Sequence, residues 1–467
     1  MRKLLCSTAS LVADFIESLP SRPVAASLSR GELLKRLGRP LRNGPLPPEK
    51  VIRELAADAA GGLVGSAGPR YFGFVIGGAA PAGVAADWLT TAWDQNAQAY
   101  DSSPAASVVE EITARWLVQL LGLPASSSAG FVTGCQMANF TALAAARNTL
   151  LARAGWNIET KGLFGAPRIA VLTSDQSHAT IRNALRLAGF GASQIRSIPS
   201  DHQGRLLLKE LASELRKLKG RPVIVSAQAG NVHTGAFEPL DAISRLLAGK
   251  NAWLHVDGAF GLWAAVSPRL RHLLRGMEYA DSWATDAHKW LNTPYDSGLV
   301  FIKDAAAHRG IKGARCAYAG SVSDDKRDGS SYAPENSRRA RAFVLYAVLR
   351  SLGRSGVRMM VERCCGLAAR FAGKAAELPR ARILNEVVLN QVLIRFEPPG
   401  VKDDADFHEA VAAEVRRGGE CWLGATRWKG LPAGRVSVSN WSTTEADIDR
   451  SVKALAAAVE CVSSRSR

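Results

Sequence analysis

The chain has 467 residues and a formal net charge of +17, with 47% hydrophobic and 22% charged residues. This length exceeds that of one ordinary domain and predicts two or three domains. The composition is that of a globular protein, which excludes a disordered chain. No apolar run approaches the roughly 20 residues that a membrane-spanning helix needs, so we expect no membrane association.

The basic residues are spread along the chain, and the densest groups, at 216–221 and 338–341, are small. No helix-turn-helix or zinc-finger spacing accompanies them, so we expect a solvated basic surface and no nucleic-acid partner. The seven cysteines form no Cys-x-x-Cys pair. This pattern argues against a disulfide framework and against a metal site, and it predicts a reducing, cytoplasmic location.

Residues 1–75 predict an N-terminal helical arm. Residues 11–19 read as an amphipathic helix, whereas the turn-rich segment 39–48 contains several prolines and cannot be helical throughout. Such an arm has little core of its own. We therefore expect it to pack on a second copy of the chain in a homodimer.

Residues 76–337 alternate short apolar runs with segments of helical periodicity, which is typical of a mostly parallel sheet covered by helices. The predicted strands are 168–173, 222–226, 252–256 and 298–302, and the predicted helices are 107–121, 137–153 and 179–188. The Gly-, Ser- and charge-rich segment 304–337 predicts a long mobile loop at the end of this large domain.

Residues 338–467 predict a smaller C-terminal α+β domain. It begins with a long helix over 338–355 and contains strands near 387–396 and 435–438. Arg435 could neutralise an anionic substrate, but a structural role is the more common one for such a residue.

Two motifs carry the chemistry of this chain. His255-Val-Asp-Gly-Ala-Phe260 contains Asp257, and Asp286-Ala-His-Lys-Trp290 contains Lys289, 32 residues further on. A lysine that forms a Schiff base must be held dry, and a pyridoxal phosphate (PLP) ring needs a carboxylate at its pyridine nitrogen. The spacing leaves room for two strands and a connection, so Asp257 and Lys289 can both reach one cofactor.

Together these motifs resemble the group II pyridoxal-dependent amino-acid decarboxylases, the aromatic-L-amino-acid and glutamate decarboxylase group. The resemblance covers roughly residues 45–450 and is greatest from 130 to 300. It implies an α/β PLP-dependent fold of the aspartate-aminotransferase type (type I), with a small C-terminal domain. It also implies PLP as cofactor and N-terminal helices that lie across the partner of a homodimer.

A turn that opens a helix offers backbone amides to an anion, and Gly130-Phe-Val-Thr-Gly-Cys-Gln-Met-Ala-Asn139 has this form. The resemblance places the cofactor phosphate here, at Thr133, Gly134, Cys135 and Gln136. Cys135 and Gln136 stand where Gly and Ser are usual in the family. The amides would still serve, whereas the contribution of these side chains is open.

The resemblance assigns five more residues to the cofactor. His178, which follows a predicted strand, would stack on the ring and touch the substrate carboxylate. Asn231 stands where the family usually has Thr and would contact the ring hydroxyl, while Ala259 would pack beneath the ring. Asp286 and His288, which flank the lysine, would touch the phosphate or orient the amine.

The predicted reaction is decarboxylation of an L-amino acid by a carboxy-lyase, with Lys289, Asp257 and His178 as catalytic residues. In similar enzymes a tyrosine on a mobile loop protonates the carbanion, and Tyr318 and Tyr332 are the candidates here. Without that tyrosine, the same site could act as an aldehyde synthase. A carbon-carbon lyase, an aminotransferase and a catalytically silent, basic PLP-binding protein stay open as alternatives, and the substrate side chain is not determined.

Overall fold

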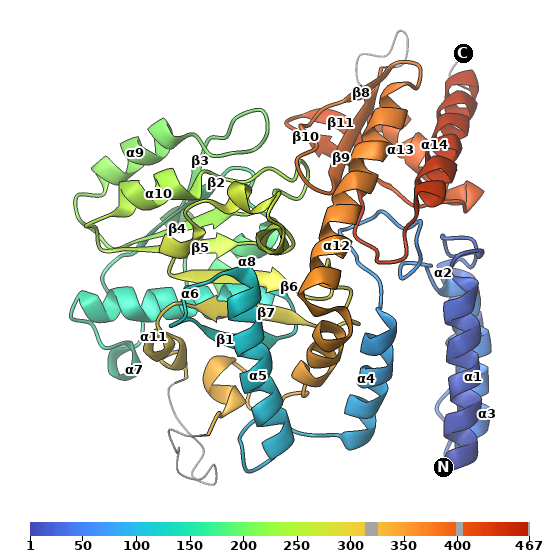
Figure 1. The fold of residues 1–467 in the computed structure, drawn as a ribbon, viewed down its shortest axis with the longest axis horizontal. Helices are drawn as coiled ribbons and strands as arrows, with labels where there is room; N and C mark the ends of the chain where they lie inside the picture. The colour runs from blue at the N-terminus through green and yellow to red at the C-terminus, as the bar shows by residue number, and fades with distance from the viewer. Residues whose placement is uncertain (313–325, 398–404, 466–467) are drawn as a thin grey trace. The chain divides into compact units, whose positions relative to one another are not determined.

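The structure is a computed structural model that describes residues 1–312, 326–397 and 405–465 (Figure 1). The chain divides into two compact units. The first consists of Met1–Gly78, Leu367–Leu384 and Val392–Arg467, and the second of Ala79–Gly366 and Asn385–Gln391. The N-terminal residues therefore belong to the same unit as the C-terminal residues. The division at Gly366 lies within a helix and does not coincide with the predicted boundary at residue 337.

The second unit is built on a mixed sheet of seven strands in the order β1-β7-β6-β5-β4-β2-β3 (Figure 1). From β6 to β3 all neighbours are parallel, whereas β7 is antiparallel to both β6 and β1. The prediction of a mostly parallel sheet is thus confirmed. The strands are β1 Ser128–Val132, β2 Ala170–Ser174, β3 Ile195–Ile198, β4 Val223–Gln228, β5 Ala252–Asp257, β6 Ser282–Asp286 and β7 Gly298–Ile302.

Helices α4 Pro81–Trp93 and α5 Pro104–Leu121 precede β1. The connections between the strands contain α6 Cys135–Arg153, α7 Ile158–Lys161, α8 Ala179–Leu187, α9 Leu208–Lys217 and α10 Leu240–Leu247, and α11 Ala305–Arg309 follows β7. The segment predicted as a loop over 304–337 contains α11 and the short 3-10 helix η6, Gly329–Tyr332. The predicted long helix begins slightly later, as α12 Ala342–Ala376, and its backbone is non-helical at Gly353.

Helix α6 is the central element of the large core, because it packs across β5, β6 and β7. Its buried side chains Ala138, Ala142, Ala145 and Ala146 recur at the helical spacing of three and four residues. Small side chains on this face let the helix lie close to the sheet. The N-terminus of α6 is thereby held beside the carboxyl ends of β5 and β6.

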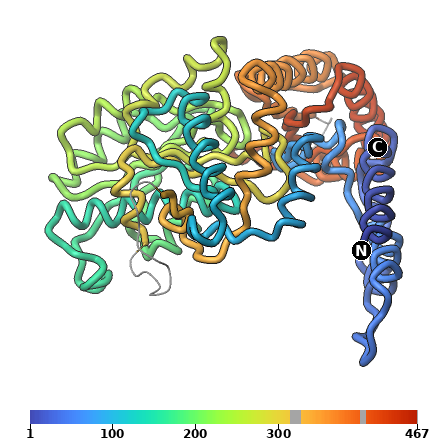
Figure 2. The backbone as a smooth tube through the Cα atoms, turned by 60° about the horizontal axis from the view of Figure 1, so that its bottom comes forward, coloured from blue at the N-terminus to red at the C-terminus, as the bar shows by residue number. Residues whose placement is uncertain are grey.

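The first unit contains a four-stranded sheet in the order β10-β11-β9-β8. Its strands are β8 Ala381–Ile383, β9 Gln391–Phe396, β10 Gly424–Trp428 and β11 Leu431–Ser437, and its helices α13 Ala405–Gly418 and α14 Glu445–Arg465 pack on each other. The N-terminal helices are α1 Arg2–Ser18, α2 Arg30–Leu37 and α3 Pro48–Ala59. Helices α1 and α3 lie side by side, as the blue end of the tube shows (Figure 2).

Candidate active site

Adjacent strands and one helix bring the predicted residues together. Asp257 is the last residue of β5, and Asp286 is the last residue of β6, the parallel neighbour of β5. Carboxyl ends of parallel strands meet at one edge of a sheet, where α/β enzymes bind ligands. Cys135, the first residue of α6, lies at the same edge because its backbone N–H donates to Asp286 Oδ1 over 2.6 Å.

Lys289 lies in the turn that follows β6, and its Nζ is 3.1 Å from Asp286 Oδ2. The lysine side chain is 20% exposed and that of Asp286 only 4%. Burial is the largest single effect and acts against the charged amine, but the charge and hydrogen bond of Asp286, together with the electrostatic effects of Cys135 and Asp257, outweigh it and raise the pKa of Lys289. Without a ligand, the site therefore holds Lys289 as an ammonium ion in an ion pair.

Asp257 is buried, and its two carboxylate oxygens have different surroundings. Oδ1 accepts hydrogen bonds from the thiol of Cys135, at 3.4 Å, and from the backbone N–H of Ala259, at 3.2 Å. Within the described residues, Oδ2 has no hydrogen-bond partner. One oxygen is thus held by the protein while the other is left for a donor on a ligand.

The N-terminus of α6 can receive an anion. The first amides of a helix have no partner inside it, and the partial positive charge there favours a negative group. The amide of Cys135 is taken by Asp286, which leaves the amides of Gln136 and Met137 in this turn. A Cβ at Gly298 would meet Gly134 Cα at 2.4 Å, so the turn before α6 packs directly against β7. Thr133 and Gly134 are partly buried and Gln136 is exposed.

His288 is held on three sides. Its Nδ1 accepts from the backbone N–H of Ser297 at 3.1 Å, its Nε2 is 3.4 Å from Asp286 Oδ1, and its ring stacks on Tyr295 with centroids 4.3 Å apart. Burial lowers the pKa of His288 although Asp286 opposes this effect, so the ring is neutral at neutral pH. Sequence reasoning missed Tyr295. Its position six residues after Lys289, within the same motif, was the available signal.

The remaining predicted cofactor residues follow the neighbouring strands β2 and β4. His178 is the N-cap of α8, where its Nδ1 accepts from the backbone N–H of Thr180, and its ring is exposed. Asn231 is buried and bridges two turns: Oδ1 accepts from the N–H groups of His233 and Thr234, and Nδ2 donates to Gln176 O at 3.4 Å. Its predicted contact with a ring hydroxyl stays a prediction.

Of the two predicted tyrosines, the structure describes Tyr332, which is not brought to this cluster. Tyr332 ends η6, where the Arg327 guanidinium lies 4.1 Å from its ring centroid and the His308 ring lies 5.2 Å away. Its backbone also lies against β1, since a Cβ at Gly130 would meet Tyr332 O. Among the described residues, its contacts include neither Lys289 nor the two carboxylates. Tyr318 lies outside the described residues.

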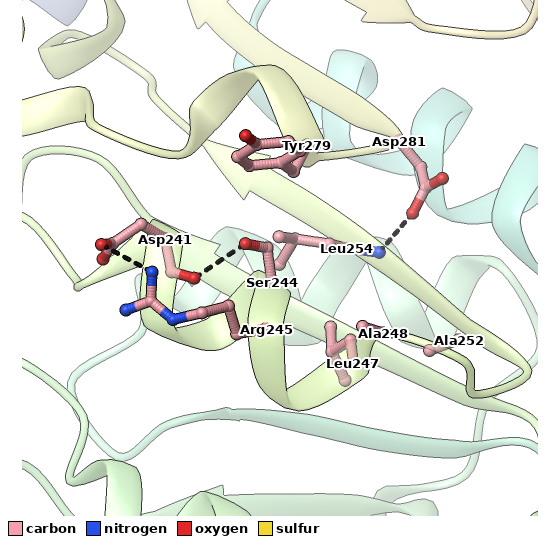
Figure 3. A pocket seen from close by; sticks show the side chains of 9 residues that line it. All are labelled: Asp241, Ser244, Arg245, Leu247, Ala248, Ala252, Leu254, Tyr279 and Asp281. Atoms are coloured by element: carbon pink, nitrogen blue, oxygen red, sulfur yellow. Dashed lines mark hydrogen bonds and ion pairs between the residues drawn. The ribbon is translucent and has the colours of Figure 1, made fainter.

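A cavity of about 470 Å³ lies at the opposite ends of the same strands (Figure 3). Its lining includes Ala252, which begins β5, and Asp281, whose carboxylate accepts from the backbone N–H of Leu254 at 2.7 Å. A strand rises about 3.3 Å per residue, which places this end of β5 roughly 16 Å from Asp257. The cavity is therefore separate from the Lys289 cluster.

Comparison with known proteins identifies the family. Residues 33–397 match the pyridoxal-dependent decarboxylase conserved domain. The chain belongs to the pyridoxal-dependent decarboxylase family. It is 28% identical to the aromatic-L-amino-acid decarboxylase of Bacillus atrophaeus, over 98% of this chain and 95% of that protein, and 27% identical to the phenylacetaldehyde synthase of a Rosa hybrid cultivar, over 83% and 82%.

The solved structures agree with the sequence relatives. The crystal structure of Oryza sativa TDC with PLP and tryptamine has a TM-score of 0.91 at 25% identity, over 98% of this chain and 97% of that one. The type I α/β fold, the PLP cofactor and decarboxylation of an amino acid are thus confirmed as predicted. Among the described residues, no helix is long and apolar enough to cross a membrane.

The side chains of the cluster fit PLP. The decarboxylase offers one mostly buried amine, a carboxylate oxygen without a partner at Asp257, and a helix N-terminus held against β7. These three groups are the partners that an aldehyde carbon, a pyridine nitrogen and a phosphate require. The roles of the individual residues remain predictions.

Proposed function

We propose that the decarboxylase removes the α-carboxylate of an aromatic L-amino acid and releases the amine, with PLP bound at Lys289. The observation that carries this proposal is the pairing of the Lys289 ammonium with Asp286 in the same cluster as Cys135 and Asp257. The aromatic substrate is inferred from the relative of Bacillus atrophaeus and from the tryptamine complex of the rice protein.

PLP supplies an electron sink for the electrons left when CO₂ departs. Asp257 would hold a proton on the pyridine nitrogen through its free Oδ2, because a buried carboxylate stabilises the adjacent cation. The amides of Gln136 and Met137, with the hydroxyl of Thr133, would hold the phosphate. His288 would support that end of the site through its neutral ring, which Ser297 and Tyr295 fix in place.

Lys289 must lose a proton before its amine can bond to a carbonyl carbon. Asp286 would hold and orient the amine toward the cofactor, since its Oδ2 is 3.1 Å from Nζ.

His178 and Ala259 would contact opposite faces of the cofactor ring. Ala259 lies two residues beyond Asp257 and its N–H is bonded to that carboxylate. The His178 ring is exposed, and its Nδ1 accepts from the backbone N–H of Thr180. Its Nε2 would donate to a substrate carboxylate. Asn231 would support this wall by joining the turns after β2 and β4.

Aldehyde formation is the second candidate function, and two observations favour keeping it. A relative of similar identity is a phenylacetaldehyde synthase. In addition, Tyr332 contacts Arg327 and His308, not the Lys289 cluster. A site without a proton donor for the carbanion would let oxygen react, yielding an aldehyde, ammonia and peroxide.

We also propose that the protein is a cytoplasmic homodimer. Helices α1, α2 and α3 expose Leu5, Leu34 and Leu55, each more than half accessible in the single chain, and burial of such side chains on a second copy would stabilise the arm. Six cysteines are free in the described part of the chain, which fits a reducing compartment.

Product analysis tests the reaction. The purified holoenzyme is incubated with tryptophan, tyrosine, phenylalanine, glutamate and diaminobutyrate, and CO₂, amine, aldehyde, ammonia and peroxide are measured. We expect CO₂ and aromatic amine in equal amounts. Equal amounts of aldehyde and ammonia would replace the first candidate with the second, and turnover of glutamate alone would reject the aromatic substrate.

The covalent attachment of PLP is tested with the variant Lys289→Ala and its control Lys303→Ala. Lys303 follows β7, and its Nζ donates to Glu278 O at the surface. Lys289→Ala should abolish the borohydride-reducible attachment of PLP, whereas Lys303→Ala should keep it. Attachment that survives in Lys289→Ala would contradict the proposed site.

A further inference from the structure

Cys135 touches both carboxylates of the site. Its thiol lies 3.4 Å from Asp257 Oδ1, and its backbone N–H donates to Asp286 Oδ1 over 2.6 Å. The two aspartates end neighbouring strands, so a single residue at the start of α6 connects both strand ends to the helix. The buried Cys135 side chain has a polar contact at the centre of the cluster.

The thiol can act only as a donor toward Asp257. Burial, together with the negative charges of Asp257 and Asp286, raises the pKa of the Cys135 thiol well above its usual range. The sulfur therefore keeps its proton, and a carboxylate accepts but does not donate. The S–H···O contact is thus a directed hydrogen bond to an anion.

This bond selects which oxygen of Asp257 faces a ligand. Oδ1 receives two donors, the Cys135 thiol from α6 and the Ala259 N–H from the turn after β5. Two donors from different elements fix the plane of the carboxylate. Within the described residues Oδ2 receives none, so the ligand-facing position is left to this oxygen.

We infer that Cys135 is a positioning residue that orients Asp257, so that Oδ2 meets the pyridine nitrogen of the cofactor. The inference rests on the proposed function, because it assumes that Asp257 pairs with that nitrogen. The start of α6 is itself fixed against β7, where Gly298 leaves no room for a side chain beside Gly134. The Cys135 thiol is therefore held in a fixed position, and its hydrogen bond fixes the orientation of the Asp257 carboxylate.

Three variants test this inference. Cys135→Ala removes the donor, Cys135→Ser keeps one, and Cys421→Ala removes another buried thiol, which contacts Ser451 O at 3.9 Å in the first unit. The dissociation constant of PLP is measured by absorbance titration of the cofactor-free proteins, and the pH at which half of the cofactor is released is measured on the acid side.

Cys135→Ala should weaken PLP binding about 5-fold, the equivalent of one hydrogen bond. Its acid midpoint for release should move to higher pH, because loss of a donor makes protonation of the carboxylate easier. The PLP dissociation constant of Cys135→Ser should lie within about 2-fold of the wild-type value, because a hydroxyl also donates to the anion. Cys421→Ala should match the wild type in both measurements.

The outcomes separate the two levels of the proposal. A wild type that binds no PLP, or a Lys289→Ala variant that still attaches it covalently, overturns the proposed function. A normal wild type together with a Cys135→Ala variant unchanged in affinity and acid midpoint overturns the role of Cys135 alone. If Cys135→Ala does not fold, Cys135→Val replaces it, since valine fills the volume without a donor and should bind PLP more weakly than Cys135→Ser.

Discussion

The ion pair between Lys289 and Asp286 should make a measurable contribution to the stability of the cofactor-free protein. The two charged atoms are 3.1 Å apart and both side chains are mostly buried. Coulomb's law with an effective dielectric constant of about 20 gives a gross attraction of about 5 kcal/mol at this distance. Desolvation offsets part of it, but removing one partner leaves an unpaired buried charge, at a cost of about 3–5 kcal/mol.

Of the two single variants, Asp286→Asn should lose more stability. Asparagine keeps an oxygen for the N–H of Cys135 and places an uncharged amide beside Lys289. We expect the free energy of unfolding to fall by about 3 kcal/mol. Lys289→Met should cost less, because the Asp286 carboxylate keeps two donors, the backbone N–H of Cys135 and the Nε2–H of His288, 3.4 Å away.

A double-mutant cycle measures the coupling energy between Lys289 and Asp286. Urea unfolding of the cofactor-free proteins, followed by fluorescence and circular dichroism, should show that the double variant Asp286→Asn/Lys289→Met loses at least about 2 kcal/mol less than the sum of the single variants. The surface pair Glu214–Lys217, at 2.6 Å, is the control, with an expected coupling below about 0.5 kcal/mol. Additivity within about 0.5 kcal/mol for the buried pair would refute this reasoning.

Two more predictions concern the core and the phosphate turn. Burial lowers the pKa of His255 and of His308 to about 3, so the stability that each neutral ring contributes is complete above the unfolded pKa of about 6.5 and is lost as the pH falls toward 3. At pH 5 each histidine should lower the free energy of unfolding by about 2 kcal/mol relative to pH 7.5. In urea unfolding, His308→Gln should remove the part of this pH dependence that His308 contributes. An unchanged pH dependence would show that His308 is not a buried neutral ring. Gly298→Ala should weaken PLP binding at least about 10-fold, because its Cβ would meet Gly134 Cα at 2.4 Å. Gly366→Ala, whose Cβ would meet nothing within 4 Å, should bind PLP like the wild type in the same absorbance titration, and equal affinities of the two variants would contradict the close packing of the turn.

The sequence alone determined the elements whose signal is local. The predicted apolar runs of β2, β4, β5 and β7 each correspond to an observed strand, because a strand that is buried on both faces needs a continuous run of apolar residues. Helix α6 was also predicted from the sequence, since its buried alanines follow the helical period. The Asp257 and Lys289 motifs, through their resemblance to the group II decarboxylases, predicted the fold class, the cofactor and the type of reaction.

Strand β6 was not predicted, although it carries Asp286 to the site. Its sequence Ser282-Trp-Ala-Thr-Asp286 is largely polar, yet all five residues are buried. The Ser282 hydroxyl is bonded to His255 and to Trp253, both on β5. A polar residue can occupy the core when a neighbouring strand supplies a partner, and a single sequence does not reveal that partner.

Only the tertiary structure decided how the site residues relate to one another. Cys135 is more than a hundred residues from Asp257 in the chain, and their contact exists because α6 lies across β5 and β6. In the same way, Tyr332 had a suitable side chain in a suitable segment, but its ring packs against Arg327 and His308. Side-chain chemistry is local to the sequence, whereas the distance between two side chains depends on the packing of every element between them.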